Sequence, residues 1–392
     1  MKKVALIGNM NNNFYAFSRY LKEFSHIEVH LFLFQTDYFH PSDDAFTENW
    51  KEYTFQLNWG NLKTFNSKTF KHIKTQFSSY NFIIGCGLSP AFLYKAGLKL
   101  DVFVPYGSDL YDSPFFRLNK PSILYYRILC SKAQRKGIRE AKAVLMIPTG
   151  GFLEQFLNKI SPNANHLKLG VPMLYIKEYT SEIFKEKKKQ FNTVNKINNI
   201  KAQGRKIIFH SSRHCWTKKQ GEFENKGNNY LFEGLKKVKE ENNGVLNFHL
   251  VTFEYGVDVD SSKELAKYLN IEDHITWVPK SSRKEVMMIL STAHIVVGEL
   301  YNSFLSYGVI YEALALKKII IHKREDHLYT NYYKDLYPML YADSSNSVKD
   351  SLIYINENSD EIPQMVEAGY EWFLKYMVKK PLDVFLSLIS SS

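Results

Sequence analysis

Residues 1–24 read "MKKVALIGNMNNNFYAFSRYLKEF" and contain a strand, a turn and a helix in succession. The run KKVALIG (2–8) is apolar after its two lysines and has the length of a buried strand. The segment after the turn carries apolar side chains on one helical stripe: Phe14, Phe17, Tyr20, Leu21 and Phe24. A strand that is apolar on both faces needs helices on both faces, so this unit predicts a parallel sheet between helices.

The same alternation continues along the chain in two blocks. The first block closes at LKLGVPMLY (167–175), and the second begins at RKIIFHSS (205–212) after a lysine-rich segment. Because 392 residues exceed the size at which one core usually stops growing, two domains are expected. We therefore predict an α/β protein with two Rossmann-like, doubly wound domains that face each other across a cleft. The expected parts are a first domain (1–175), a lysine-rich linker (176–204), a second domain (205–360) and C-terminal helices (361–392), broken at Pro381, that cross back to the first domain.

The alternation also locates the individual elements. Strands are expected at 2–8, 27–34, 80–87, 101–107, 143–148, 205–212, 248–254, 275–279, 294–299, 318–322 and 338–342. Helices are expected near 63–78, 89–96, 120–140, 151–160, 227–243, 261–269, 282–292 and 307–316. Sites in doubly wound sheets form at the carboxyl ends of strands, so the residues just after each strand are the candidates for function.

The composition, with 45% apolar and 23% charged residues, is that of an ordinary globular protein. A formal net charge of +11 favours anionic partners such as nucleotide phosphates, acidic lipid or nucleic acid. No RNA-binding or DNA-binding motif is visible, so we expect no nucleic acid partner. The first apolar run is too short for a signal peptide and no segment is long enough to span a bilayer, which predicts a cytoplasmic location.

The three cysteines, Cys86, Cys130 and Cys215, are scattered and show no CxxC spacing. This pattern indicates a reducing compartment and argues against a structural zinc site. No other cluster of metal ligands stands out, so we expect neither an obligate metal nor another cofactor.

Two strand ends in the first domain carry candidate residues. In GNMNNNF (8–14) the glycine permits a tight turn and the amides that follow suit an anion, although asparagines are also good structural caps. In VPYGSDLY (104–111) the aspartate is either a helix cap or a carboxylate that binds an acceptor hydroxyl or acts as a base. The candidates are Gly8, Asn9 and Asn12 on the donor side and Gly107, Ser108 and Asp109 on the acceptor side.

The second domain has a candidate anion site in HSSRHCWTKKQGEFENKGNNY (210–230). Arg213 follows a strand, and Lys226 and Gly227 open the next helix. A cation at a helix start is unfavourable unless an anion arrives, which favours a diphosphate site over a surface lysine.

A further candidate stretch, YGVIYEALALKK (307–318), follows a later strand. Tyr307, Gly308 and Val309 lie one turn before Glu312 and leave room for a ligand against backbone amides. A carboxylate near a helix start suits the helix dipole, and it equally suits the two hydroxyls of a ribose. Geometry along the sequence leaves both interpretations of Glu312 open.

Taken together, the order and spacing of these motifs resemble GT-B glycosyltransferases, specifically the retaining group allied to the GT4 family. The resemblance implies transfer of a sugar from a nucleotide-sugar, in which Arg213 and Lys226 neutralise the diphosphate leaving group and Glu312 holds the ribose. The matching segments are Arg213, Lys226–Gly227, Glu312–Ala313–Leu314–Ala315, IGNMNNNFYAFSRYL (7–21), GCGLSPAFLYKAG (85–97), VPYGSDLY (104–111) and GVPMLY (170–175).

The resemblance also implies that the Gly8 loop faces the phosphates and that Gly308 and its neighbours contact the diphosphate or the donor sugar. One position departs from the pattern of that group. Its glutamate pair places a second acid eight residues before Glu312, where this chain has Phe304. Glu299, at the preceding strand end, is the residue that we expect to substitute for it as a catalytic acid.

The function expected from this resemblance is metal-independent hexosyl transfer, with retention, to a glycan or lipid-linked acceptor in cell-surface polysaccharide synthesis. Peripheral contact with an anionic membrane is expected through the basic and aromatic stretch 115–139. Two alternatives remain open. One is a nucleotide-sugar epimerase or a phosphorylase on the same scaffold, and the other is a non-enzymatic binder of nucleic acid or anionic membrane.

Overall fold

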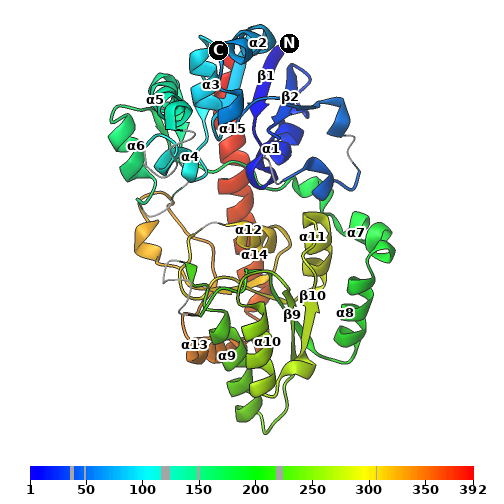
Figure 1. Ribbon diagram of the computed structural model, residues 1–392. Helices are drawn as coiled ribbons and strands as arrows, with labels where there is room; N and C mark the ends of the chain where they lie inside the picture. The colour runs from blue at the N-terminus through cyan, green and yellow to red at the C-terminus, as the bar shows by residue number, and fades with distance from the viewer. Residues whose placement is uncertain are drawn as a thin grey trace. The chain divides into compact units, whose positions relative to one another are not determined.

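The computed structural model describes residues 1–35, 39–47, 50–115, 124–146, 148, 151–217, 224–305 and 307–392. The chain divides into two compact units, each built from parallel strands and helices (Figure 1). The first unit comprises Met1–Tyr175 together with Lys375–Ser392, and the second comprises Ile176–Leu374.

The sheet of the first unit has the strand order β3–β2–β1–β4–β5–β6–β7, and all its pairings are parallel. β1 pairs with β2 on one side and with β4 on the other, so the direction of winding reverses between β1 and β4. This reversal is the topological switch point at which doubly wound sheets bind ligands. The strands are β1 (Lys2–Ile7), β2 (Ile27–Leu33), β3 (Thr54–Gln56), β4 (Phe82–Gly85), β5 (Val102–Phe103), β6 (Ala143–Leu145) and β7 (His166–Leu167).

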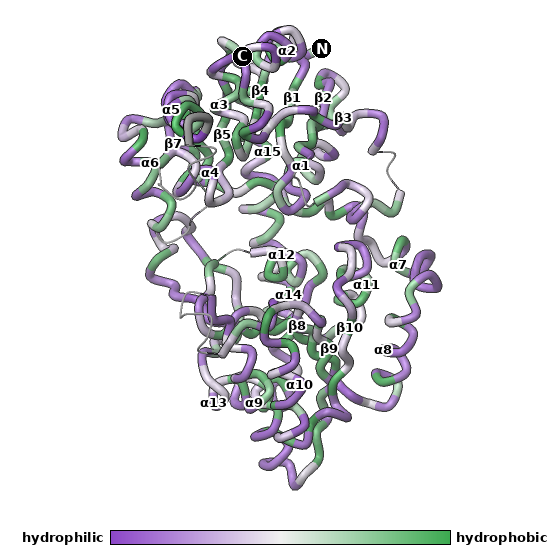
Figure 2. The backbone as a smooth tube through the Cα atoms, in the orientation of Figure 1, coloured by the Kyte–Doolittle hydropathy of each residue, from purple (hydrophilic) through white to green (hydrophobic). Residues whose placement is uncertain are grey.

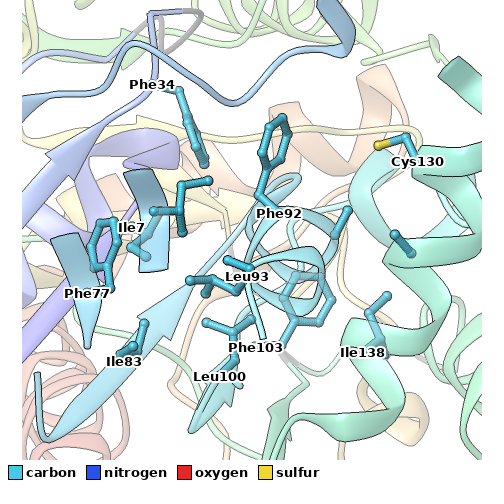
Figure 3. Close-up of a cluster of buried hydrophobic side chains, with 14 of the residues drawn as sticks. Ile7, Phe34, Phe77, Ile83, Phe92, Leu93, Leu100, Phe103, Cys130 and Ile138 are labelled. Atoms are coloured by element: carbon cyan, nitrogen blue, oxygen red, sulfur yellow. The ribbon is translucent and has the colours of Figure 1, made fainter. Parts of the chain in front are cut away.

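Alternate residues of β1 enter different hydrophobic clusters, because successive side chains of a strand point to opposite faces. Ala5 and Ile7 belong to one cluster, and Val4 and Leu6 belong to another. Figure 3 shows the first of these clusters, with Ile7, Phe92 and Phe103 among its members. The helices of this unit are α1 (Asn13–Leu21), α2 (Ser67–Phe77), α3 (Ser89–Lys95), α4 (Ser108–Tyr111), α5 (Leu124–Glu140), α6 (Glu154–Ile160) and α15 (Lys380–Ser390).

The sheet of the second unit has the order β10–β9–β8–β11–β12–β13, again with parallel pairings. Its switch point lies between β8 and β11, because β8 pairs with β9 on one side and with β11 on the other. The strands are β8 (Lys206–His210), β9 (Phe248–Phe253), β10 (Ile275–Val278), β11 (Ile295–Val297), β12 (Ile319–His322) and β13 (Leu340–Tyr341).

Helices cover both faces of this second sheet as well. Every residue of β9, β11 and β12 is buried, which a strand exposed on one face cannot achieve. Figure 2 shows the segment around β9 in the green of hydrophobic residues, whereas much of α8 is purple. The helices are α7 (Ser181–Lys187), α8 (Asn192–Ala202), α9 (Asn228–Glu241), α10 (Val259–Tyr268), α11 (Arg283–Thr292), α12 (Gly308–Ala315), α13 (Ser345–Glu357) and α14 (Ile362–Phe373).

The C-terminal segment passes from one unit to the other. α14 belongs to the second unit, a π-helical stretch spans Leu374–Lys379, and α15 then packs in the first unit through Phe385 and Ile389. The chain ends lie side by side (Figure 1), and the Lys2 ammonium donates to the carbonyl of Ser392. The π-helical stretch interrupts the regular α-helix between α14 and α15, before Pro381, which occupies the first turn of α15.

Most expected elements are found, with differences where short or charged segments depend on packing. The short edge strands β3 and β7 were not predicted. The expected lysine-rich linker instead forms α7 and α8, which belong to the second unit and bury Val194 and Ile197. Residues 116–123 of the expected membrane-facing stretch, the beginning of the helix expected at 120–140, and residue 147 of the strand expected at 143–148 lie outside the described residues. In the described part of the chain, every helix is too short or too polar to cross a bilayer.

Candidate functional site

The candidate residues lie at the carboxyl ends of strands beside the two switch points. In the first unit they follow β1 and β5, and the Cys86–Gly87 turn follows β4 between them. In the second unit Arg213 and Lys226 follow β8, and Glu299 and Tyr307 follow β11. Because β8 and β11 are neighbours, their loops meet at one edge of the sheet, which is the position expected for a nucleotide site.

The turn after β1 requires glycine at its first position. Gly8 has φ +91°, and a Cβ there would lie 2.3 Å from Cys86 Sγ. Asn11 and Asn12 follow with φ of +54° and +56°, in the left-handed region that asparagine tolerates better than other side chains. The sequence of this turn is therefore explained by backbone geometry, whether or not it binds a ligand.

The asparagine side chains of this turn are buried and hydrogen-bonded within the protein. Asn9 Nδ2 donates to Asn12 Oδ1 at 2.6 Å and to Phe39 O, while Asn9 Oδ1 accepts from Tyr15 N. Asn12 Nδ2 donates to Asp44 Oδ1 at 2.7 Å and to His40 O. Both amide groups thus hold the turn in place. A ligand contact by the Asn9 or Asn12 side chain, as expected from the sequence, would require these bonds to break.

Asp109 joins two turns at the same edge. Its carboxylate accepts from the amides of Tyr106, Gly107 and Gly87, at 2.9–3.0 Å. Burial raises the pKa of Asp109 to about 6, although the three amides oppose this shift. Ser108, beside it at the start of α4, is exposed. Asp109 therefore has a structural role in the first unit, and its raised pKa also suits a group that takes up and releases a proton near neutrality.

Lys226 and Glu299 form an ion pair across the switch point of the second unit. Lys226 Nζ lies 3.0 Å from Glu299 Oε2, and the two side chains are only 13% and 15% exposed. Burial raises the pKa of Glu299 above its ordinary value, and Lys226 opposes the shift. The loop after β8 is thereby tied to the loop after β11, and the tie is reinforced by the Leu300 amide, which donates to Lys226 O.

Arg213 belongs to the same charged cluster. Its guanidinium pairs with Glu224, and both side chains are about half exposed. Arg213 lowers the pKa of Glu299 whereas Glu224 raises it, so all four charges interact electrostatically. The Lys226 amide donates to Cys215 O at 2.7 Å, which brings residue 226 back beside the segment that carries Arg213. Arg213, Lys226 and Glu299, named from the sequence, are thus brought together.

The N-terminus of α9, which is the positive end of the helix dipole, lies beside this cluster because Lys226 directly precedes its N-cap. Gly227 is its N-cap in the left-handed conformation, with φ +69°, and no side chain caps the helix. Asn228, the first helical residue, accepts from Cys215 N and donates to His210 Nε2, while His210 Nδ1–H donates to Val297 O at 2.8 Å. An uncapped helix start flanked by arginine and lysine is suited to binding a phosphate.

Buried polar side chains anchor the segment that carries Arg213. His214 Nε2 lies 3.0 Å from Thr252 Oγ1, and its Nδ1 lies 2.9 Å from Ser262 Oγ. The Asp258 carboxylate accepts from the amides of Trp216 and Thr217. Burial lowers the pKa of His214 to about 3, so the ring stays neutral. These contacts fix the loop without using Arg213 itself.

Tyr307 faces the loop that carries Glu299. Its hydroxyl accepts from the Glu299 amide at 2.6 Å, which places the tyrosine ring behind this loop at the start of α12. His322 continues the network, because its Nδ1 contacts Ser303 Oγ at 3.2 Å and its Nε2 contacts the hydroxyl of Tyr337. Gly308 and Val309, which follow Tyr307, form the first turn of α12.

Glu312 is buried and paired with a residue that the sequence did not single out. Its Oε1 lies 3.3 Å from Arg283 Nε, and the two side chains are 9% and 12% exposed. The first turn of α12 contains no acidic residue, so the interpretation of Glu312 as first-turn charge against the dipole is wrong. Burial raises the pKa of Glu312 and Arg283 opposes the shift. A cation at the start of α11 is itself unfavourable when unpaired, and that was the available signal for Arg283.

Neither a cluster of metal ligands among the described residues nor a related sequence points to a function. In the part of the chain that is described, no group of three or more His, Cys, Asp or Glu side chains is arranged to hold a metal ion. Comparison of the sequence with protein-family models finds no match, and comparison with curated proteins finds none.

Solved structures share the fold of this chain at low sequence identity. The HepE protein of Anabaena, solved in complex with UDP-glucose, superposes with a TM-score of 0.61 at 12% identity, over 100% of both chains. WaaG, a glycosyltransferase involved in lipopolysaccharide biosynthesis, superposes with a TM-score of 0.56 at 12% identity, over 97% of this chain and 99% of WaaG. A UDP-N-acetylglucosamine 2-epimerase gives a TM-score of 0.53 at 11% identity, over 94% and 90% of the two chains. The predicted α/β fold of GT-B type, with two Rossmann-like sheets, is confirmed, while the narrower GT4 likeness stays a prediction.

Proposed function

We propose that the protein is a glycosyltransferase that moves a sugar from a nucleotide-sugar to a glycan or lipid-linked acceptor. The observation that carries this proposal is the cluster of Arg213, Lys226 and Glu299 at the β8–β11 switch point, beside the uncapped start of α9. Two cations and a helix N-terminus on one sheet edge suit the charge that develops on a departing nucleoside diphosphate. The shared fold with HepE, which was solved with UDP-glucose, supports the choice of donor class.

In this proposal, different residues of the second unit bind different parts of the nucleotide-sugar. Arg213 and Lys226 neutralise the diphosphate, and the backbone of Gly227 lets it approach the helix start. Glu312, held by Arg283, accepts hydrogen bonds from the ribose hydroxyls, and the first turn of α12 with Tyr307, Gly308 and Val309 lies beside the donor. Because protein cations supply the positive charge, the reaction proceeds without a metal ion.

The first unit contributes the acceptor side. Its turns at Gly8 and Gly107 present backbone to the substrates, and Asp109 with Ser108 contacts the acceptor hydroxyl. The transfer is of hexosyl type with retention, Glu299 is the candidate catalytic acid, and the product belongs to a cell-surface polysaccharide. The enzyme works in the cytoplasm, with peripheral contact to an anionic membrane.

The test is a thermal-shift screen of nucleotide-sugars, because a ligand that binds the native state raises the melting temperature. Hits are followed by isothermal titration with UDP, GDP and ADP, and by turnover assays with lipid-linked acceptors. Binding that is lost in Lys226→Ala and Glu312→Ala supports the assignment. If none of the three diphosphates binds the native protein, the proposal is abandoned.

The likeness to a UDP-N-acetylglucosamine 2-epimerase makes an epimerase the second candidate. Incubation of the donor without any acceptor separates the two reactions. An epimerised nucleotide-sugar would identify an epimerase, whereas a glycosyltransferase leaves the configuration of the donor's sugar ring unchanged at C2.

A further inference from the structure

Each of the two cations at the β8–β11 switch point is already paired with a glutamate. Arg213 pairs with Glu224, and Lys226 pairs with Glu299 at 3.0 Å. The four side chains carry no net formal charge, although the sequence alone predicts a positive cradle. An incoming phosphate therefore approaches a neutral cluster. Its attraction to the two cations depends on whether the two carboxylates stay paired with them.

The burial of the Lys226–Glu299 pair means that one partner cannot simply be removed. The two side chains are only 13% and 15% exposed, and an uncompensated charge at such a place is costly. A ligand that takes the place of Glu299 has to supply its own negative charge to Lys226. Burial raises the pKa of Glu299 and repulsion from Glu224 adds a smaller rise, so an added anion would push both carboxylates away from the cations.

Two cations beside one turn match two linked phosphoryl groups. The Lys226 amide donates to Cys215 O, so Lys226 lies next to the segment that begins at Arg213. When one phosphoryl group replaces one carboxylate, an anion replaces another anion, so the exchange contributes little binding free energy. Exchange of both by a single ligand makes the second exchange intramolecular, and the ligand also gains the uncapped start of α9.

We propose that Glu224 and Glu299 are internal substitutes for the phosphoryl groups of the ligand, and that one carboxylate leaves its cation for each phosphoryl group that binds. This inference rests on the proposed function and deepens it, because it names a ligand with two linked phosphoryl groups and assigns two residues that limit its affinity. When the diphosphate product departs, the glutamates return to Arg213 and Lys226, which favours product release.

The test measures binding of inorganic pyrophosphate and inorganic phosphate by isothermal titration, so that neither the base nor turnover enters. Each single variant, Glu224→Gln and Glu299→Gln, is expected to bind pyrophosphate more tightly, by on the order of fivefold. In the double variant the two increases in affinity are expected to multiply for pyrophosphate. Inorganic phosphate has one phosphoryl group, so its affinity is expected to rise only as much as in one single variant. Glu240→Gln, which breaks an exposed pair with Lys236 on α9, is the matched control and is expected to change neither affinity.

Weaker or unchanged pyrophosphate binding in both single variants overturns the inference, as does the absence of pyrophosphate binding in every variant. Glu224 is about half exposed, so its variant remains informative if Glu299→Gln does not fold. Variants that follow the pyrophosphate pattern in a protein that binds no nucleotide would leave this inference standing while the proposed function fails.

Discussion

The two units have the same kind of switch point, but the polar groups at these points are arranged differently. In the first unit, Asn9, Asn12 and Asp109 are buried and hydrogen-bonded to neighbouring turns, so the strand ends are fixed by neutral amides and one carboxylate. In the second unit, Arg213 and Lys226 face carboxylates that an anion can replace. The same topology therefore supports two kinds of sheet edge. We call the hydrogen-bonded edge with Asn9, Asn12 and Asp109 the rigid edge, and the edge with the paired cations Arg213 and Lys226 the charged edge.

The largest expected difference between the units is their response to acid. His210, His214 and His322 of the second unit are fully buried, and burial lowers their pKa values to about 4, about 3 and about 3. Because these values lie below 6.5, the unfolded chain binds more protons than the folded one as the pH falls from 6.5 to about 4. Each histidine then costs about 1.4 kcal/mol of stability per pH unit, or several kcal/mol in total by pH 5.

Asp109 of the first unit shifts in the opposite direction. Its pKa is raised to about 6 in the folded protein, so its contribution to stability is present at low pH and is lost as the pH rises through 6. Hydrogen exchange at pH 7, 6 and 5 is therefore expected to show α9 and β9 opening before β1 and β4. The comparison breaks down if the two units lose protection together, or if the first unit opens first.

The second prediction concerns the charged edge. Lys226→Met is expected to weaken UDP binding by on the order of 100-fold, because it removes a partly buried cation and leaves Glu299 without its partner. Lys236→Met on the outer face of the same helix is the control, since it breaks only an exposed pair with Glu240. Titration calorimetry measures both. Equal losses in the two variants would mean that the effect comes from net charge and not from the site.

The third prediction concerns the rigid edge. Asn12→Ala is expected to destabilise the protein by about 2 kcal/mol, because Asp44 and His40 O lose a buried donor. Urea unfolding measures this loss. Asn66→Ala, which removes an exposed cap of α2, is expected to cost about 1 kcal/mol and serves as the reference. A loss for Asn12→Ala below that of Asn66→Ala would contradict a structural role for the turn.

The smallest effect is expected from a matched pair within the second unit. Thr252 and Thr276 each hydrogen-bond a buried histidine, at 3.0 Å to His214 and 2.9 Å to His249. Both Thr→Val variants are expected to lose on the order of 1 kcal/mol of stability, with the larger loss in Thr252→Val because the Thr252 hydroxyl also donates to His210 O. Only Thr252→Val is expected to weaken UDP binding, by about threefold, because His214 directly follows Arg213. Unchanged UDP affinity in Thr252→Val would show that Arg213 needs no such anchor.

The placement of the candidate residues was predictable because strand ends are local features. Apolar runs locate the strands, parallel strands align their carboxyl ends, and Arg213, Lys226 and Glu299 follow such runs directly. The pairing of these residues was less accessible. The sequence does not single out Glu224, and it indicates a catalytic acid in Glu299 rather than the partner of Lys226.

Errors arose where a side chain's role depends on what packs against it. The position of Glu312 along the chain suggests a charge that interacts with the dipole of its own helix, but the residue that it contacts is Arg283 at the start of α11. The charges of the lysine-rich segment predict a linker, whereas α8 within it belongs to the second unit and buries two apolar residues, Val194 and Ile197. Neither contact has a signature in local spacing.

The sequence by itself determined two blocks of parallel strands and helices, because the period of apolar residues is set by strand and helix geometry within a few residues. It also determined that Arg213, Lys226 and Glu299 follow two strands of the second block, and that asparagines and Asp109 follow two strands of the first. Only the tertiary structure decided that the asparagines of the first unit are held by buried hydrogen bonds, while the cations of the second unit are held by glutamates. The physical reason is that electrostatic and hydrogen-bond partners are chosen by distance in space, and residues such as Lys226 and Glu299, 73 positions apart, become neighbours only when β8 and β11 pair.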